Sequence, residues 1–316
     1  MKTAYPRLCL TTLAIAGLTA CGGGGGGGAS AGVGVTVTPN FTSWSAAVLP
    51  GSTVVAAGDS QQGTYTWTPP VGPGTGTVTS VTTNPQQTGA TFTESFSAST
   101  GLAQTVRFQT ASGTDISFTR GVDMFFVLTI NSDFWAIESA DGTKYALMAD
   151  PILSGWEYQS FGIWTTGLGT GSGTYGSASV GWPTPAGSIP TSGSATYFGY
   201  AGGRHVASDG SSYFTLANMN TTANFATRQL GFTTNSTEQS EFLFGSTPNA
   251  SLNMAGTLTY VSGSNQFSGP VSTASGMTGT AKGRFYGPVA QEIGGTFSTT
   301  GGGVQSYGGA FGGARP

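Results

Sequence analysis

The sequence predicts an all-β protein with two β-rich modules, the second of which closes into an eight-stranded antiparallel β-barrel. Three observations predict this class. Charged residues make up only 7% of the chain, whereas glycine supplies 53 of its 316 residues. No segment has the apolar spacing of a long amphipathic helix, and many short segments alternate polar and apolar residues between turn signals. Low charge with abundant glycine, hydroxyl and aromatic residues is typical of strands.

Residues 1–20 have the pattern of a lipoprotein signal peptide. Lys2 and Arg7 form a basic start, and the apolar run 8–18 is too short to span a bilayer. The Leu-Thr-Ala sequence before Cys21 resembles a bacterial lipobox. That resemblance implies cleavage before Cys21 and acylation of Cys21, so that the acyl chains anchor the protein in a lipid bilayer. An ordinary signal peptide cut elsewhere is the alternative.

Residues 21–40 are predicted to be a glycine-rich tether between this anchor and the folded part. Gly22 rather than an acid follows Cys21, which favours the outer membrane in lipoproteins of this kind. The formal net charge of −3 provides no basic stripe for phosphates, so nucleic acid is not an expected partner.

The first module is assigned to residues 41–152. Strand-like segments at 64–68 and 77–83 are separated by a Pro-Gly breaker, and 90–98 alternates with two phenylalanines in one register. Segments 133–139 and 143–149 predict a hairpin across Asp141-Gly142, because Asp-Gly favours a tight turn with positive φ.

The second module is assigned to residues 153–316 and holds about nine strand candidates, a number that suits a closed barrel. Within residues 277–286, the odd positions carry mostly small apolar residues and one ring, whereas Thr278, Thr280, Lys282 and Arg284 share the other face. Glycines beside bulky rings fit the narrow interior of an eight-stranded barrel. Closure predicts that the first strand, 158–166, pairs with the last, 306–314.

Several motifs of this module resemble the β-barrel domain of transferrin-binding protein B. They are Gly-Arg-Phe-Tyr-Gly-Pro at 283–288, Glu-Ile-Gly-Gly-Thr-Phe at 292–297 and Gly-Ala-Phe-Gly at 309–312, with an earlier hairpin at 190–199. The resemblance covers residues 156–315. It implies a β-rich handle-like domain followed by the barrel, which matches the two modules.

The resemblance also implies binding rather than catalysis. Members of this group are surface lipoproteins of Gram-negative bacteria that capture host transferrin, haemoglobin, haem or complement regulators. The expected function is therefore that of a lipid-anchored outer-membrane surface protein that binds a host or environmental protein or haem, in iron or haem acquisition. No cofactor is expected apart from haem as a ligand. This chain has one lobe where the transferrin receptors have two, so transferrin itself is not inferred.

Two other functional classes remain open. One is an adhesive, immune-evasion or structural surface lipoprotein with no nutrient role. The other is an integral outer-membrane barrel, which needs an apolar outer band, whereas Thr, Lys and Arg occupy the predicted outer face of 277–286. An enzyme is least favoured, because no nucleophile, base or metal constellation stands out.

His205, the only histidine, is the sharpest candidate for a ligand-binding residue, together with its neighbours Arg204 and Tyr200. In relatives that bind haem, an imidazole is a suitable axial ligand, and Tyr197 or Tyr200 would lie near it. The alternative is a polar residue in a short exposed hairpin, since turn signals flank it. One imidazole without a second ligand does not predict a metal site.

The remaining motifs favour structural roles. Gly58-Asp59-Ser60 resembles the start of a serine-esterase block but lacks the expected leucine and a later Asp-x-x-His. Asp141-Gly142 and Asp209-Gly210 lack the acids of a calcium loop and predict turns. Glu292 is expected to accept hydrogen bonds from loop backbone or to pair with Lys282 or Arg284.

Two long segments, 182–193 and 233–248, are predicted to be loops on the barrel, where binding surfaces often lie. Ordinary solvated connections are the alternative, so no contact residues are assigned there.

Overall fold

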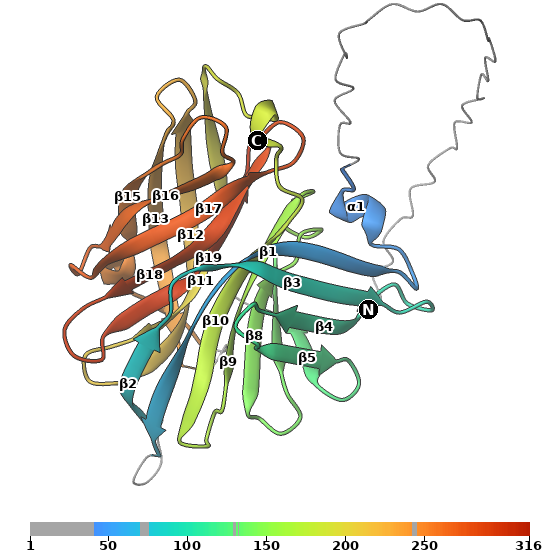
Figure 1. The fold of residues 1–316 in the computed structure, drawn as a ribbon. Helices are drawn as coiled ribbons and strands as arrows, with labels where there is room; N and C mark the ends of the chain where they lie inside the picture. Colours follow the sequence, from blue (N-terminus) through green and yellow to red (C-terminus); the bar gives the residue numbers. More distant parts are fainter. Residues whose placement is uncertain (1–40, 70–75, 129–130, 132, 242–244) are drawn as a thin grey trace, which may run out of the picture. The chain divides into compact units, whose positions relative to one another are not determined.

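The computed structural model describes residues 41–69, 76–128, 131, 133–241 and 245–316. The predicted signal peptide, Cys21 and the whole predicted tether lie outside the described residues. The all-β prediction is confirmed: beyond one helical turn, α1 (Trp44–Ala47), and two short 3-10 turns at Ala186–Ser188 and Ala250–Leu252, the described elements are strands (Figure 1).

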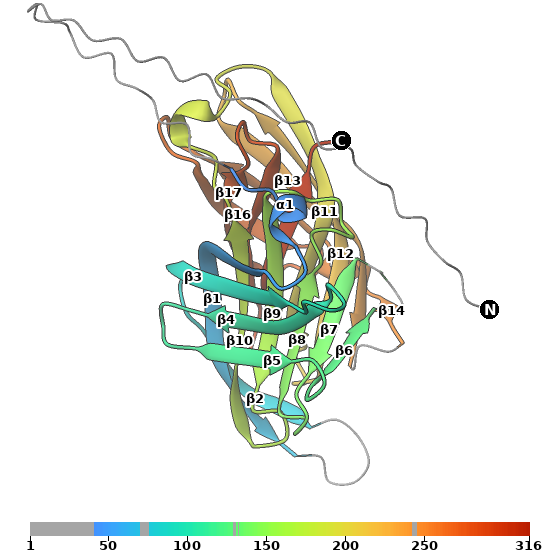
Figure 2. The same cartoon turned by 90° about the vertical axis from the view of Figure 1, so that its right-hand side faces the viewer.

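The first sheet has ten strands in the described residues. They are β1 (Thr53–Thr68), β2 (Thr77–Thr83), β3 (Gln87–Phe96), β4 (Ala103–Gln109), β5 (Asp115–Thr119), β6 (Met124–Val127), β7 (Phe134–Glu138), β8 (Lys144–Ala149), β9 (Gln159–Thr166) and β10 (Ser172–Gly181). Their order is β5-β4-β3-β1-β10-β9-β8-β7-β6, and β2 pairs with the second half of β1. The sheet curls, so that β3, β4 and β5 cross in front of β8 and β9 in Figure 2.

Alternating burial explains the curl. In β1, Val54 and Ala56 are buried between exposed neighbours, and they join Phe92, Phe108 and Trp164 in one apolar core on the concave face. The predicted hairpin of β7 and β8 is confirmed, with Gly142 at φ +67° in its turn.

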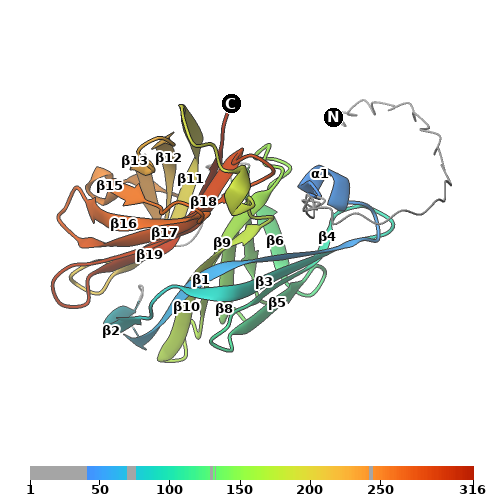
Figure 3. The same cartoon turned by 45° about the horizontal axis from the view of Figure 1, so that its top comes forward.

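The second sheet is a closed antiparallel barrel. Its strands are β11 (Ser194–Val206), β12 (Ser212–Asn224), β13 (Gln229–Ser240), β15 (Met254–Thr259), β16 (Gln266–Thr273), β17 (Thr278–Tyr286), β18 (Glu292–Thr300) and β19 (Ser306–Ala314), with the short β14 (Thr247–Pro248) against β13. The order is β12-β11-β19-β18-β17-β16-β15-β13, and β12 pairs with β13 to close the ring (Figure 3). The eight-stranded barrel is confirmed.

The barrel interior follows the predicted parity. Ala281, Phe285, Ile293, Phe297 and Phe311 are fully buried members of one core. Two interior glycines face each other across the β17–β18 ladder, at positions 283 and 295. A methyl group on the first of them would come 2.6 Å from the Cε2 atom of the Phe267 ring, so the missing side chain provides room for that ring.

Two predictions about strand placement are wrong. The predicted first barrel strand, residues 158–166, is β9 and pairs with β8 and β10 in the first sheet, while β19 closes onto β11. The buried side chains of β9 pack between the curled sheet and the outer face of the barrel, which is why its hydrophobicity resembled that of a barrel strand. The segment 233–248 is mostly not a loop, because β13 continues to Ser240.

The sheets change between Gly181 and Ser194, whereas the predicted domain boundary lies at residues 152 and 153. The assignment of 41–152 and 153–316 as domains stays a prediction. The predicted loop at 182–193 is the connection between the two sheets and contains one 3-10 turn.

Polar contacts join the first sheet to the outer face of the barrel. Arg284 on β17 forms a two-pronged ion pair with the buried Asp59 on β1, through bonds of 2.6 Å each. The hydroxyls of Tyr286 and Ser179 lie 3.0 Å apart. The two sheets are therefore one packed body within residues 40–316.

Candidate functional site

Arg204 lies where the first sheet meets the barrel. It is near the end of β11, where side chains alternate between the interior and the outer face. Tyr197, Ala201 and His205 face inward, so Arg204 faces out of the barrel toward the first sheet. Only 9% of Arg204 is exposed.

Neutral groups surround the Arg204 guanidinium. Its Nε donates to Ser212 Oγ at 2.8 Å, and its Nη1 donates to Thr165 Oγ1 at 2.6 Å. The guanidinium carbon lies 4.2 Å from the centre of the Tyr65 ring, a cation–π contact. In the described part of the chain, the ion pairs are Arg107 with Asp115 and Arg284 with Asp59, so no carboxylate pairs with Arg204. Burial lowers the pKa of Arg204, because it disfavours the charged form.

A cavity of about 310 Å³ opens beside this guanidinium. Its walls come from the ends of both sheets and include four aromatic side chains. The lining residues used below are Tyr65, Trp67, Tyr145, Phe214, Glu138 and Glu241. A pocket of this size and composition is typical of a small-molecule site.

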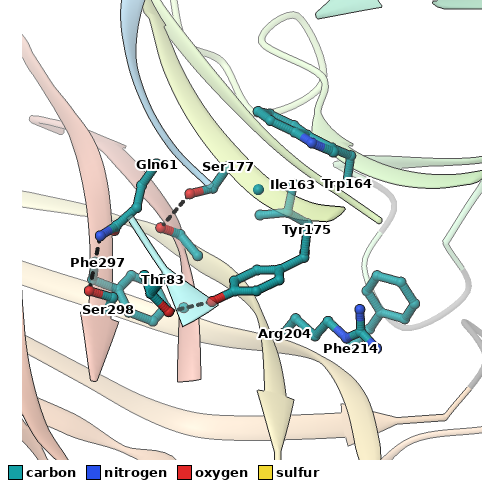
Figure 4. A pocket seen from close by; sticks show the side chains of 13 residues that line it. Gln61, Thr83, Ile163, Trp164, Tyr175, Ser177, Arg204, Phe214, Phe297 and Ser298 are labelled. Atoms are coloured by element: carbon teal, nitrogen blue, oxygen red, sulfur yellow. Dashed lines mark hydrogen bonds between the residues drawn. The ribbon is translucent and has the colours of Figure 1, made fainter. Parts of the chain in front are cut away.

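A second cavity, of about 10 Å³, is also lined by Arg204 and Phe214 and is large enough for roughly one water molecule. Figure 4 shows Arg204 beside Phe214, with Tyr175 reaching toward Thr83. On the far side, Gln61 donates to Ser298 at 3.0 Å. These contacts close the junction between the sheets around the second cavity.

The three predicted ligand-binding residues do not form one site. His205 points into the barrel, where its ring stacks on Tyr213 and meets the edge of Tyr307. Tyr200 lies on the opposite face of β11 and donates to Asp133 Oδ2 at 2.8 Å. The two residues therefore cannot ligate one iron atom, whereas Arg204 lines the cavity.

The prediction that His205 is exposed on a short hairpin is wrong, since only 6% of it is exposed. Neither ring nitrogen has a partner within hydrogen-bond geometry in the described residues, although the Gln239 side chain is near enough to influence the ring. Burial lowers the pKa of His205 and outweighs the opposing effects of Gln239 and Asp209. His205 as a haem ligand stays a prediction.

Glu292 has the predicted structural role. Its carboxylate accepts backbone N–H bonds from Glu157 at 2.7 Å and from Tyr158 and Gln159 at 2.9 Å each. It therefore fixes the start of β9 against the barrel. The alternative partner Arg284 pairs with Asp59 instead.

A second buried carboxyl, Glu94, lies in the core of the curled sheet and is 5% exposed. Burial, and then the charge of Asp150, raise its pKa to about 8, against the opposing charge of Arg120. One terminal nitrogen of Arg120 is buried without a hydrogen bond among the described residues. Nothing in the sequence pattern singles out this group.

The sequence analysis did not predict the junction between the first sheet and the outer face of the barrel. The central outward positions of β19 are Gly308, Ala310 and Gly312, none with a side chain larger than a methyl group. A barrel face of that kind cannot be a polar surface, so the pattern itself could have indicated that another element covers it.

The comparisons with known proteins identify the barrel. Residues 189–315 match the family model described as the C-lobe and N-lobe β-barrels of Tf-binding protein B. The barrel has the transferrin-binding protein B fold. The match begins at residue 189 rather than at 156, in agreement with the observed start of the second sheet. No curated protein sequence matches the chain.

Solved structures of transferrin-binding protein B are similar to larger parts of the chain. A mutant from Haemophilus parasuis Hp5 is 13% identical with a TM-score of 0.44, covering 71% of this chain and 53% of its own. The protein from serogroup B Neisseria meningitidis is 16% identical with a TM-score of 0.39, covering 73% and 53%. A mutant from Actinobacillus pleuropneumoniae H49 is 14% identical with a TM-score of 0.35, covering 52% and 78%. The chain thus spans about half the length of the first two proteins.

Two kinds of feature are absent from the described residues. No helix there is both long and apolar enough to cross a membrane. No group of three or more His, Cys, Asp or Glu residues is placed there to hold a metal ion.

Proposed function

We propose that this protein is a lipid-anchored protein of the bacterial outer surface that binds a host or environmental ligand and serves iron or haem acquisition. The observation that carries the proposal is the transferrin-binding protein B fold of the barrel. The relatives are named for a protein ligand, so the expected partner is a protein or the haem that a protein carries.

Exposed apolar side chains support a protein partner. Val122, Met124 and Val127, at and beside strand β6, are 67%, 55% and 40% exposed. Strand β6 is at the end of the strand order of the first sheet. Apolar groups along a sheet edge suit contact with another polypeptide.

The anchor is tested first. In the native host, the full chain is expected to incorporate labelled palmitate and to be cleaved by protease added to intact cells. Cys21→Ser is expected to abolish labelling and to release the protein from membranes. Labelled Cys21→Ser protein, or a wild-type protein that resists protease until cells are lysed, would contradict the surface lipoprotein.

The ligand is tested separately. The full chain is titrated with haem, and the same protein is used to capture partners from serum. Acquisition predicts saturable binding of haem or of an iron- or haem-carrying serum protein. Binding of neither would overturn the acquisition role.

The second candidate is an adhesive, immune-evasion or structural surface protein without a nutrient role. The exposed apolar groups near β6 favour a protein partner in this case too. Capture of a complement regulator or a matrix protein, without haem or an iron carrier, would favour it.

A further inference from the structure

The charge of Arg204 is the starting point. The residue is nine-tenths buried, and moving a cation out of water costs several kcal/mol unless an opposite charge compensates it. Its partners in the structure are two hydroxyls and the face of Tyr65, all neutral. A guanidinium has five N–H donors, so it can donate to a further acceptor group without breaking these contacts.

The cavity beside it has an apolar lining that suits a ring or chain. Tyr65, Trp67, Tyr145 and Phe214 are the aromatic side chains of its wall, and its volume of about 310 Å³ fits a molecule of two or three rings. The Tyr145 hydroxyl is protonated near neutral pH, as in any tyrosine, and can donate; burial and then the charge of Glu138 raise its pKa further.

The other charges on the lining limit the ligand. Glu138 is half-buried and Glu241 is exposed, and neither pairs with a cation among the described residues. They repel a second negative charge on a ligand, whereas the buried guanidinium attracts the first.

From this combination we propose that the cavity between the first sheet and β11–β12 binds a small aromatic or apolar monoanion, whose carboxylate or similar group is held by Arg204. Charge-assisted hydrogen bonds to the guanidinium provide selectivity, and the aromatic walls provide contact area. The cavity takes a small molecule rather than a polypeptide, so the inference goes beyond the proposed capture of a protein or haem, although Glu138 of its lining is the register partner of Met124 on β6.

The probe is 1-anilinonaphthalene-8-sulfonate, a monoanion that fluoresces in apolar pockets. Its matched neutral control is N-phenyl-1-naphthylamine, which has the same rings without the sulfonate. The full chain carrying Cys21→Ser is used, since it needs no detergent. We expect one sulfonate site per chain and an affinity at least about tenfold higher for the anion than for the neutral probe.

Three variants locate the site. Arg204→Met is expected to lower the affinity for the anionic probe by about tenfold or more. It is expected to change the affinity for the neutral probe by less than about threefold. Arg204→Lys keeps the charge but loses the forked geometry, so its affinity for the anionic probe is expected to lie between those of the wild type and Arg204→Met. Arg228→Met removes an exposed arginine of the barrel and is expected to change neither affinity.

Equal affinity of the wild type for the two probes, or unchanged anion binding by folded Arg204→Met, would overturn the proposal. If Arg204→Met does not fold by circular dichroism, the wild-type preference and the Arg204→Lys loss decide it. Arg204→Lys is expected to capture serum proteins as well as the wild type does. The probe measurements therefore test the cavity independently of whether the protein binds a host protein.

Discussion

Two buried carboxyls in this protein have opposite surroundings. Glu292 has three backbone N–H donors, whereas Glu94 has apolar neighbours and only distant charges. Burial raises the pKa of both, to about 7 for Glu292 and to about 8 for Glu94. In the first case the hydrogen bonds pull the pKa partly back down, so the ionised form remains useful to the structure.

Glu94 makes stability depend on pH. Because its pKa is about 8 when folded and 4.5 ordinarily, the unfolded chain loses this proton first as the pH rises. Stability therefore falls from about pH 4.5 to about pH 8. Glu292 contributes to the lower part of that range, so the change from pH 7 to 8.5 belongs mainly to Glu94 and amounts to about 1 kcal/mol.

Glu94→Gln is expected to remove this loss of stability. Urea unfolding at pH 7 and at pH 8.5 measures it. Glu241→Gln, at an exposed position, is expected to keep it. A Glu94→Gln protein that still loses about 1 kcal/mol between pH 7 and 8.5 would show that another group titrates.

Single residues were the least predictable level. The structural role of Glu292 could be inferred because a lone acid in a glycine-rich corner has few alternatives. The burial of His205 could not, since its position inside or outside the barrel depends on the parity of β11, and turn residues beside it suggested exposure. The importance of Arg204 depends on what faces it from β1 and β9, which no local pattern contains.

At the level of elements, the outer face of the barrel is shaped to receive β9. Gln159 of β9 is fully buried and lies against the paired glycines 294 and 312 on β18 and β19. A methyl group on Gly312 would come 2.6 Å from Gln159 Nε2. Such a contact requires either the Gln159 amide to shift or the two sheets to move apart, and the full burial of Gln159 makes both changes costly.

Gly312→Ala is expected to lower the free energy of unfolding by about 1–3 kcal/mol through this overpacking. Gly302→Ala, in an open turn where an added methyl meets nothing within 4 Å, is the control and is expected to stay within about 0.5 kcal/mol of the wild type. Guanidinium unfolding measures both. Equal stability of the two variants would mean that the junction can relax.

The barrel was predictable because period-two alternation identifies strands and small interior residues identify tight closure. Residues 277–297 contain both signals in one stretch. The first sheet was only partly predictable: the β7–β8 hairpin has a local turn signal, whereas the pairing of β1 with β10 joins residues more than a hundred positions apart. Strand β9 was assigned to the wrong sheet because burial on both faces removes the alternation that would have placed it.

At the level of the whole molecule, the Asp59–Arg284 pair couples the two sheets, and fluorescence can follow them separately. All six tryptophans precede residue 183 and none lies on a barrel strand, so tryptophan emission reports on the first sheet and its junction with the barrel, while far-ultraviolet circular dichroism reports on both sheets. One packed body predicts that the two signals share one urea midpoint in the wild type. Separate midpoints would show that the sheets unfold independently.

Asp59→Ala is expected to cost about 3 kcal/mol, because it leaves the Arg284 charge partly buried and unpaired. The double variant Asp59→Ala/Arg284→Met is expected to lose less than the single variant, since it leaves no unpaired charge. The urea midpoints of both variants measure this. A double variant that loses the sum of the two single losses would mean that the pair is not coupled.

The strand order also determines when each sheet can be completed. In the first sheet β1 pairs with β10, and in the barrel β11 pairs with β19, so in each case an early strand has a partner much later in the sequence. Pairings between such distant segments slow folding, because the chain loses the entropy of closing a long loop before the stabilising contacts form. Each sheet is therefore expected to keep an unpaired strand edge until its late strand is available, and such an edge can pair with another chain.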